Sequence, residues 1–222
     1  MKKITLWITL AVAGISSGFS ATQDESSFST CECTDVSLNN FMIEFRPSYF
    51  YPLSNHFRKI FSGGVDYQLT VSCPVYWGQN ERVRGISLFA AADYFSKDGH
   101  STYLKDKTSI TIVPVTLGVK YFFPPLGECV PVNVYVASGM KYYFVHTKNH
   151  SDYVKKRVNV NGMGGMIEVG AIGVVREHFV LDLFVSSSFR CFGAPSISSD
   201  TVESTGINVS SINAGGGVGY RF

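Results

Sequence analysis

The sequence has few charged residues and no long apolar run. Lysine and arginine number 19 and aspartate and glutamate 17 among 222 residues, so 16% of the chain is charged, against about 25% in an ordinary soluble domain. The net charge is only +2, which argues against a nucleic-acid binder that relies on bulk positive charge. No stretch reaches the roughly 18 uncharged apolar residues that a membrane-spanning helix requires. The composition also excludes a disordered chain and a coiled coil.

Helical patterns are scarce, whereas an alternation with a period of two recurs from residue 41 onward. In one segment Val65 and Tyr67 alternate with Asp66 and Gln68. Such alternation is typical of strands with one apolar and one polar face. Nothing of comparable length reads as a helix, so the sequence predicts an all-β domain over residues 41–222. The alternating segments are 41–51, 65–75, 83–95, 108–122, 132–145, 163–175, 179–190 and 209–222.

The first 40 residues have a different pattern. Two lysines precede a twelve-residue apolar run from Ile4 to Ile15, and small residues follow. This is the layout of a Sec signal peptide. A membrane anchor is disfavoured because twelve helical residues rise about 18 Å, less than the roughly 30 Å hydrocarbon core. The sequence therefore predicts a signal peptide over residues 1–20 and a flexible periplasmic arm over residues 21–40.

The connections and the placement of charge distinguish two all-β architectures. Short connections alternate with longer or more polar ones, as in an outer-membrane barrel with short periplasmic turns and longer extracellular loops. The alternative is a soluble β-sandwich, whose polar face is usually rich in charge. Here the apolar face has essentially no charge, as expected for a lipid-facing band where each ion would cost about 2 to 4 kcal/mol. The sequence therefore predicts an eight-stranded antiparallel transmembrane β-barrel. Two segments are ambiguous because apolar residues fall on the inner face: Phe89, Phe95, Ile172 and Val174.

Nine charged residues fall on the face predicted to line the barrel lumen. Inward charges in a narrow, low-dielectric space are costly when unpaired, so we expect acids and bases to form ion pairs there. Eight strands leave an interior that side chains just fill, which predicts a plugged lumen rather than an open pore. The expected charge network comprises Glu44, Arg46, Asp66, Lys120, Lys141, Glu168, Asp182 and Arg221, with Asp93 on the same face. The aromatic residues expected to point inward are Phe50, Phe89, Tyr135 and Tyr143.

The last predicted strand ends in an aromatic residue. Phe222, Tyr220 and Val218 occupy alternate positions back from the C-terminus. This resembles the signal by which the barrel assembly machinery recognises Gram-negative outer-membrane proteins. The alternative is an edge strand that ends by chance in phenylalanine. We expect Tyr220 and Phe222 to act as the assembly signal, with the cell outer membrane as the destination.

Together, these features resemble small eight-stranded outer-membrane barrels such as the OmpA and OmpX membrane domains. Three short motifs are also similar to a family of outer-membrane barrels from chlamydia-like bacteria. They are the segment FSGGVDYQL at residues 61–69, Pro114, and GVKYF at residues 118–122. This second resemblance covers residues 41–222. It implies no catalytic residue.

The chain has five cysteines, an odd number that leaves at least one thiol free or bonded to another chain. Cys31 and Cys33 lack a second pair at zinc spacing, so disulfide chemistry in an oxidising compartment is favoured over a metal site. In the barrel topology four cysteines fall on the periplasmic side: Cys31, Cys33, Cys73 and Cys129. We predict that these thiols form disulfides, some of them with other envelope proteins. The alternative is that they are inert.

The sequence predicts no enzyme, metal or cofactor. The glycine clusters at residues 161–165 and 215–219 do not complete a G-x-G-x-x-G phosphate site, and they are better explained by bends and close strand packing. His146 and His150 are four residues apart, but in a predicted loop rather than on a helix. The sequence His150-Ser151-Asp152 does not match the H-x-S pattern that resembles lipid A deacylases.

The predicted loops at residues 52–64 and 146–162 are basic. Basic groups just above a lipopolysaccharide leaflet can hold its phosphates, or can bind sulfated glycans on a host cell. The alternative is a solvated charge run. We therefore expect an envelope protein that contacts outer-membrane lipid and lipopolysaccharide, with a narrow channel or carrier for small hydrophobic or ionic solutes as the competing hypothesis. The basic residues are Arg58, Lys59, Lys148, Lys155, Lys156 and Arg157.

Overall fold

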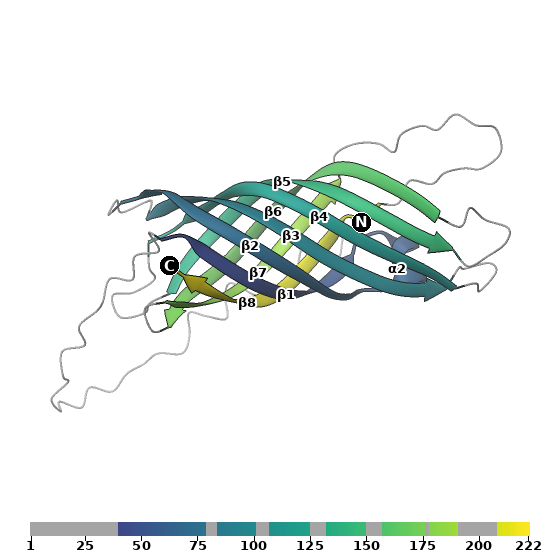
Figure 1. Ribbon diagram of the computed structural model, residues 1–222, viewed down its shortest axis with the longest axis horizontal. Helices are drawn as coiled ribbons and strands as arrows, with labels where there is room; N and C mark the ends of the chain where they lie inside the picture. Colours follow the sequence, from purple (N-terminus) through teal and green to yellow (C-terminus); the bar gives the residue numbers. More distant parts are fainter. Residues whose placement is uncertain are drawn as a thin grey trace, which may run out of the picture. The chain divides into compact units, whose positions relative to one another are not determined.

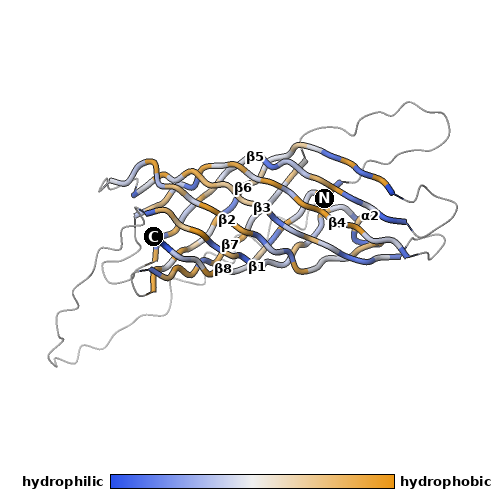
Figure 2. Tube along the Cα trace, in the orientation of Figure 1, coloured by the Kyte–Doolittle hydropathy of each residue, from blue (hydrophilic) through white to orange (hydrophobic). Residues whose placement is uncertain are grey.

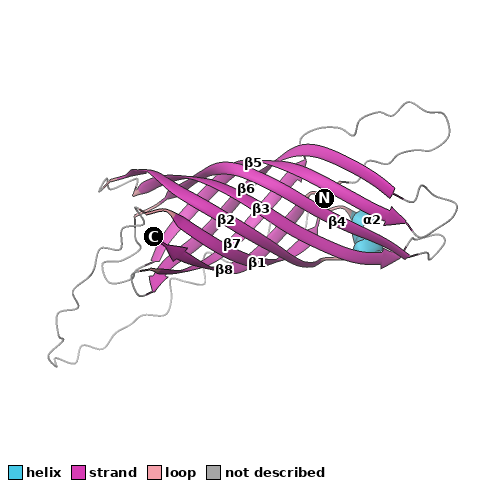
Figure 3. Ribbon diagram, in the orientation of Figure 1, coloured by secondary structure: helices cyan, strands magenta, loops and turns pink. Residues whose placement is uncertain are grey.

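Eight antiparallel strands form a closed barrel, in which each strand pairs with its neighbours in sequence and β1 also pairs with β8 (Figure 1). The computed structural model describes residues 40–78, 84–100, 107–124, 132–149, 157–175, 178–190 and 208–222. Within them α2 is the one helix, and the remaining elements are strands (Figure 3). Closure removes the free sheet edges. The predicted eight-stranded barrel is confirmed. The elements are β1 Met42–Pro52, α2 Asn55–Phe61, β2 Gly64–Trp77, β3 Gly85–His100, β4 Lys107–Phe122, β5 Val132–Asn149, β6 Arg157–Val175, β7 Phe179–Arg190 and β8 Ser211–Arg221.

The two ends of the barrel differ. At one end β1 begins beside the end of β8, where the backbone N–H of Phe222 donates to the carbonyl of Phe41 over 3.0 Å. We call this the terminal end. The opposite end holds α2 and is called the helix end (Figure 1). No helix among the described residues is long and apolar enough to cross a membrane.

The alternating sequence determines which side chains face inward. Along β1 the side chains of Met42, Glu44 and Arg46 are buried, while those of Ile43 and Phe45 are exposed. Successive side chains of a strand point to opposite faces, so the polar set of this barrel lies inside and the apolar set outside. Exposed charged side chains on the described strands lie at the helix end, where Figure 2 shows hydrophilic strand ends. They are Lys97, Asp98, Lys107, Lys148 and Arg157.

Four strands continue past the predicted loop boundaries. β3 and β4 have 16 residues each, β5 has 18 and β6 has 19, whereas β1 and β8 have 11. Much of the loops expected at residues 96–107 and 146–162 is therefore strand. His146, Lys148 and Arg157 lie on paired strands rather than in a loop, which corrects the prediction. Polar residues on both strand faces hid this extension, because the alternation that marks a strand fades where both faces are hydrophilic.

The helix α2 was not predicted. Ser54 caps it by accepting a hydrogen bond from the backbone N–H of Phe57. Phe57 and Phe61 then lie one turn apart on the same face, and both are buried. Gly99 on β3 permits the close approach of α2, because a Cβ there would lie 2.3 Å from the carbonyl oxygen of Ile60. The predicted loop at residues 52–64 thus folds back onto the barrel.

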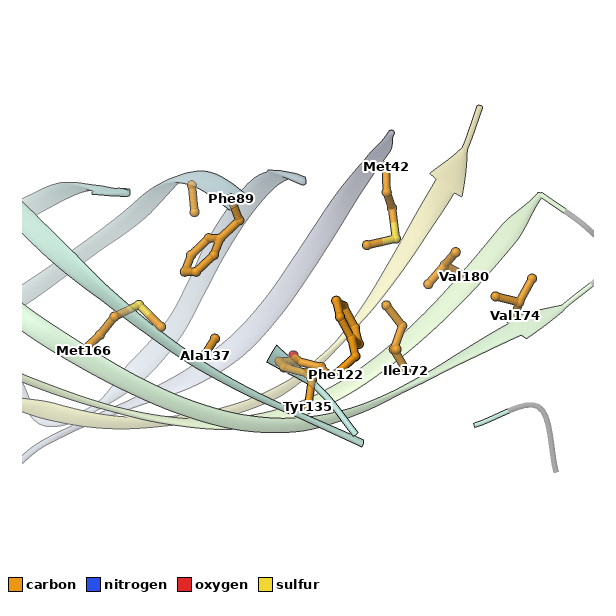
Figure 4. Packing of buried hydrophobic residues seen from close by; sticks show 10 residues of the cluster. Met42, Phe89, Phe122, Tyr135, Ala137, Met166, Ile172, Val174 and Val180 are labelled. Atoms are coloured by element: carbon orange, nitrogen blue, oxygen red, sulfur yellow. The ribbon is translucent and has the colours of Figure 1, made fainter. Parts of the chain in front are cut away.

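Two hydrophobic clusters fill the inside near the two ends. The terminal cluster gathers inward side chains from several strands around Phe122, Tyr135 and Ile172 (Figure 4). The helix-end cluster packs Phe57 and Phe61 of α2 against inward side chains of the barrel wall. It consists of Phe50, Phe57, Phe61, Phe95, Ile110, Ile112, Tyr143, Val145 and Val209. The residues that made two segments ambiguous belong to these clusters, and all are buried: Phe89, Phe95, Ile172 and Val174.

Candidate functional site in the lumen and at the strand ends

Arg46 is the centre of a charge network inside the barrel. Its side chain is fully buried, and its Nη2 lies 2.6 Å from Glu168 Oε1 while its Nε lies 3.0 Å from Asp182 Oδ2. Its Nη1 donates to Gln68 Oε1 over 2.8 Å. The guanidinium carbon also lies 3.7 Å from the ring centroid of Phe184. The planar fork of arginine suits such a site because its donors can engage several acceptors at once.

Glycines on β8 provide the space for these β1 side chains. Gly217 and Gly219 face inward, beside Arg46 and Glu44 on β1. A Cβ on Gly217 would lie 2.6 Å from Arg46 Cγ, and one on Gly219 would lie 2.9 Å from Glu44 Cγ. The glycine-rich end of the sequence is therefore explained by close packing against buried charged side chains.

Tyr135 joins the carboxylates to the guanidinium. Its hydroxyl accepts a hydrogen bond from Arg46 Nη2 over 3.0 Å and lies 2.9 Å from Asp182 Oδ2 and 3.0 Å from Glu168 Oε1. One hydroxyl proton serves only one of these acids at a time. The ring lies over Gly170, its cross-strand partner, where a Cβ would come within 2.5 Å of the ring. The absence of a side chain at Gly170 thus allows the Tyr135 ring to lie close to the barrel wall.

A second ion pair crosses the same region. Lys120 on β4 donates from Nζ to Glu44 Oε2 on β1 over 2.8 Å, and neither side chain is exposed. The ammonium also lies 5.1 Å from the ring centroid of Tyr135. Since β1 and β4 are not neighbouring strands, this pair reaches across the lumen rather than along the wall.

A third ion pair connects to the first through Gln68. Lys141 Nζ lies 2.6 Å from Asp93 Oδ2. Gln68 donates from Nε2 to Asp93 Oδ1 over 2.7 Å and accepts from Arg46, so it links the two ion pairs. Asp66 has a neutral neighbour, because Asn213 Nδ2 donates to its Oδ2 over 3.1 Å.

The structure brings most of the predicted lumen residues together. Arg221 differs, since its side chain is only half-buried at the terminal end. Lys141 pairs with Asp93, which the sequence placed on the same face but outside the expected network, and Asp66 accepts a hydrogen bond from the Asn213 amide. Gln68 and Asn213 are not in the expected network, because uncharged polar residues do not stand out on a polar face. The buried predicted residues are Glu44, Arg46, Asp66, Lys120, Lys141, Glu168 and Asp182.

Tyr220 and Phe222 form an outward aromatic group at the terminal end. The rings of Tyr220 and Phe222 lie 5.1 Å apart, and the ring of Phe222 lies 5.7 Å from that of Phe41. The side-chain amide of Asn40 donates to the Phe222 carbonyl. These contacts hold the last residue against the start of β1. The proposed role of Tyr220 and Phe222 in assembly stays a prediction.

The basic residues divide into two groups at the helix end. Arg58 is half-buried, and its guanidinium donates to the hydroxyl of Tyr51 and to Asn55 Oδ1, so it fastens α2 to β1. Lys59 is exposed. Lys148 and Arg157 are exposed and directly opposite each other on β5 and β6. The two remaining predicted basic residues, Lys155 and Lys156, lie outside the described residues.

Most of the cysteines that are predicted to form disulfides lie outside the described residues. Cys73 is a free thiol on the outward, exposed face of β2. Three other candidates, Cys31, Cys33 and Cys129, lie in parts that the structure does not describe, as do the predicted signal peptide at residues 1–20 and all of the arm but Asn40. Their disulfides stay a prediction.

Histidine offers no metal site in the described part of the chain. His146 lies on β5 and its Nδ1 bonds to the side-chain oxygen of Asn159. No group of three or more His, Cys, Asp or Glu residues is placed to hold a metal there. The predicted loop triplet at residues 150–152 lies outside the described residues.

Comparisons with solved structures show the same fold. Neisserial surface protein A is 14% identical, with 82% of this chain and 97% of that chain covered and a TM-score of 0.53. OprG from Pseudomonas aeruginosa is 16% identical, with 83% and 96% covered and a TM-score of 0.54. The protein therefore has the fold of small eight-stranded outer-membrane barrels. No protein-family model and no curated protein matches the chain. The resemblance to the barrels of chlamydia-like bacteria stays a prediction.

The ion pair between Lys120 and Glu44 leads to a prediction about the stability of single and double variants. We expect Lys120→Met to lower the free energy of unfolding by about 3 to 5 kcal/mol, because it leaves a buried carboxylate without its partner. Glu44→Met combined with Lys120→Met should recover most of that loss, since the unbranched side chain fits beside Gly219 and leaves no buried charge. Urea titration of the folded band in electrophoresis without heating measures both effects.

The control is Lys59→Met, which removes an exposed lysine and should leave the urea midpoint unchanged. If the double variant were as unstable as the single one, the loss would come from packing rather than from an unpaired charge.

The C-terminal aromatic group predicts an assembly phenotype. Deleting Phe222, or replacing it by a charged residue, should reduce folded barrel in the outer membrane while export to the periplasm continues. The heat-modifiable folded band in outer-membrane fractions measures assembly. Phe123→Ala, which removes another exposed aromatic ring, should have little effect. Undiminished folded barrel after Phe222 deletion would count against the assembly signal.

Proposed function

We propose that this protein is an outer-membrane barrel with a closed lumen, which supports the envelope and makes surface contacts through the basic groups of its helix end. The outward face supports membrane insertion, because the exposed charged side chains of the described strands are confined to the helix end. Rings of aromatic residues at both membrane interfaces are typical of such barrels. At the terminal end they are Phe41, Tyr76, Phe123, Phe179, Tyr220 and Phe222, and at the helix end Tyr49, Tyr51, Tyr94, Tyr142, Phe144 and Phe189.

The long strands support an orientation with the helix end outside the cell. About 9 to 11 tilted residues cross a membrane, and β3 to β6 have 16 to 19. Their extra length lies at the hydrophilic helix end. Outer-membrane barrels carry their larger projections on the extracellular side, which leaves the terminal end facing the periplasm.

The single observation behind the closed lumen is that side chains from distant strands meet in its middle. Arg46 on β1 contacts Glu168 on β6, and Lys120 on β4 contacts Glu44 on β1. An open aqueous pore needs many more than eight strands, because eight leave a width that side chains fill. A solute would have to break buried ion pairs to pass.

The helix-end cluster adds a second closure above these ion pairs. Phe57 and Phe61 of α2 are buried against inward side chains of β1, β3, β4 and β5. A hydrophobic solute that entered from outside would have to displace both rings. We therefore favour the closed barrel over the narrow channel or carrier, and we assign it no catalytic step.

The partners that we propose are outer-membrane lipid and lipopolysaccharide, with sulfated glycans of a host surface as the alternative for the basic groups. The assembly machinery is the proposed partner of Tyr220 and Phe222. We also propose that the periplasmic cysteines form disulfides with other envelope proteins.

Planar-bilayer recording separates the closed barrel from the channel. We expect no sustained single-channel current from the purified, folded protein. The variant Phe57→Ala/Phe61→Ala should also be silent, because the ion pairs around Arg46 remain below α2. Sustained currents from the native protein would favour the channel or carrier. Currents from the double variant alone would show that α2, rather than the charge network, is the seal.

A further inference from the structure

Lys148 and Arg157 form a like-charge pair on the outward face of the helix end. They are opposite each other across β5 and β6, and both side chains are exposed. Like charges directly opposite in a sheet are destabilising. Within the described residues no acidic side chain pairs with either of them. The acid in the same row, Asp98, is already held by Lys107 at 3.0 Å.

The pair lies just above the aromatic residues of the helix end. On β5, Tyr142 and Phe144 face outward with their ring centroids 4.9 Å apart, and Lys148 follows on the same face. Four residues span about 13 Å along a strand, which is roughly 10 Å along the membrane normal at the usual tilt. Aromatic rings mark the edge of the apolar band. The two bases therefore lie at the level of lipid headgroups.

The direction of the Lys148 and Arg157 side chains favours a ligand in the adjacent lipid leaflet. Lys148 and Arg157 share the outward strand face with the apolar band, so they project sideways toward lipid rather than over the barrel mouth. A lipid headgroup beside the barrel meets this face directly. A soluble polyanion has to enter the headgroup layer to reach it.

Neutral hydrogen-bond donors lie beside the pair. Ser109 is the cross-strand partner of Lys148, and Asn159 follows Arg157 on the same face of β6. The Asn159 side-chain oxygen accepts from His146 Nδ1, since a carbonyl oxygen cannot donate, which leaves the amide N–H groups for a ligand. Guanidinium, ammonium, amide and hydroxyl donors together match the acceptors of a phosphate group.

We propose that Lys148 and Arg157 bind a phosphate group of lipopolysaccharide in the outer leaflet. The inference rests on the proposed outer-membrane location and names the partner of the basic groups. The bound anion removes the repulsion between the two bases. In contrast, Asp98 and Lys107, an exposed acid and base at the same end, neutralise each other and need no ligand.

Binding to defined lipids tests the proposal on the native protein alone. The folded barrel in detergent is titrated with lipid A, with dephosphorylated lipid A, with phosphatidylglycerol and with a sulfated heparin oligosaccharide. Preference for lipid A over its dephosphorylated form by about tenfold or more is expected from charge-assisted contacts. Equal affinity for the two forms of lipid A would overturn the proposal. Equal or tighter binding of phosphatidylglycerol would overturn the assignment to lipopolysaccharide, and equal or tighter binding of the oligosaccharide would favour the glycan.

Paired variants locate the site. Lys148→Gln/Arg157→Gln should lose the preference for phosphorylated lipid A. Lys97→Gln removes an exposed base from the same end of the barrel and should keep it. Retained preference in the first variant would overturn the assignment to these two residues.

A stability readout separates ligand binding from a structural role. Without lipid, Lys148→Gln/Arg157→Gln should be at least as resistant to urea as the native barrel, because the like-charge repulsion is gone. Adding lipid A should raise the urea midpoint of the native protein but not of the variant. A variant less stable than native without lipid would indicate a structural role and contradict the proposal. Channel currents would overturn the closed lumen and leave this site standing, whereas loss of phosphate preference would leave the closed barrel standing.

Discussion

The interior of this barrel is organised around the buried guanidinium of Arg46. A charge that is removed from water must be surrounded by acceptors, and Arg46 obtains them from Glu168, Asp182, Gln68 and Tyr135 on other strands. These contacts impose conditions on residues that carry no charge. Gly217 must lack a side chain where Arg46 passes. The result is a lumen whose polar contents and glycine positions depend on each other.

The bilayer explains why this arrangement is the reverse of a soluble protein. A lipid-facing surface cannot carry ions cheaply, so the apolar half of each alternating strand faces outward and the polar half must be accommodated inside. Eight strands give that interior little width, which forces acids and bases into contact. Apolar side chains occupy the two ends of the lumen. The ion pairs therefore form the middle of a filled interior.

Sequence alternation predicted the strands and the inward side of the charged residues, and the lack of charge on the apolar face then favoured a barrel over a sandwich. It could not predict partners. Whether Lys141 meets Asp66 or Asp93 depends on how neighbouring strands are offset and on side-chain reach, and no local pattern encodes either. The helix α2 was missed for a related reason. Its seven residues are too few for a clear period, and its burial depends on Gly99 on a distant strand.

The same physics acts differently on charge inside and outside the barrel. Inside, Arg46 and Lys120 form ion pairs with acids of the chain itself, because their side chains are buried away from bulk water. At the helix end Asp98 and Lys107 follow that rule on the exposed surface. Among the described residues Lys148 and Arg157 have no acidic partner, although their cross-strand geometry makes the repulsion direct. In our proposal, phosphate groups of an outer leaflet supply these two bases with the counter-charge that the buried bases obtain from their own chain. The buried bases thus stabilise the barrel through acids of the same chain, whereas the exposed bases Lys148 and Arg157 are available to bind an anion outside it.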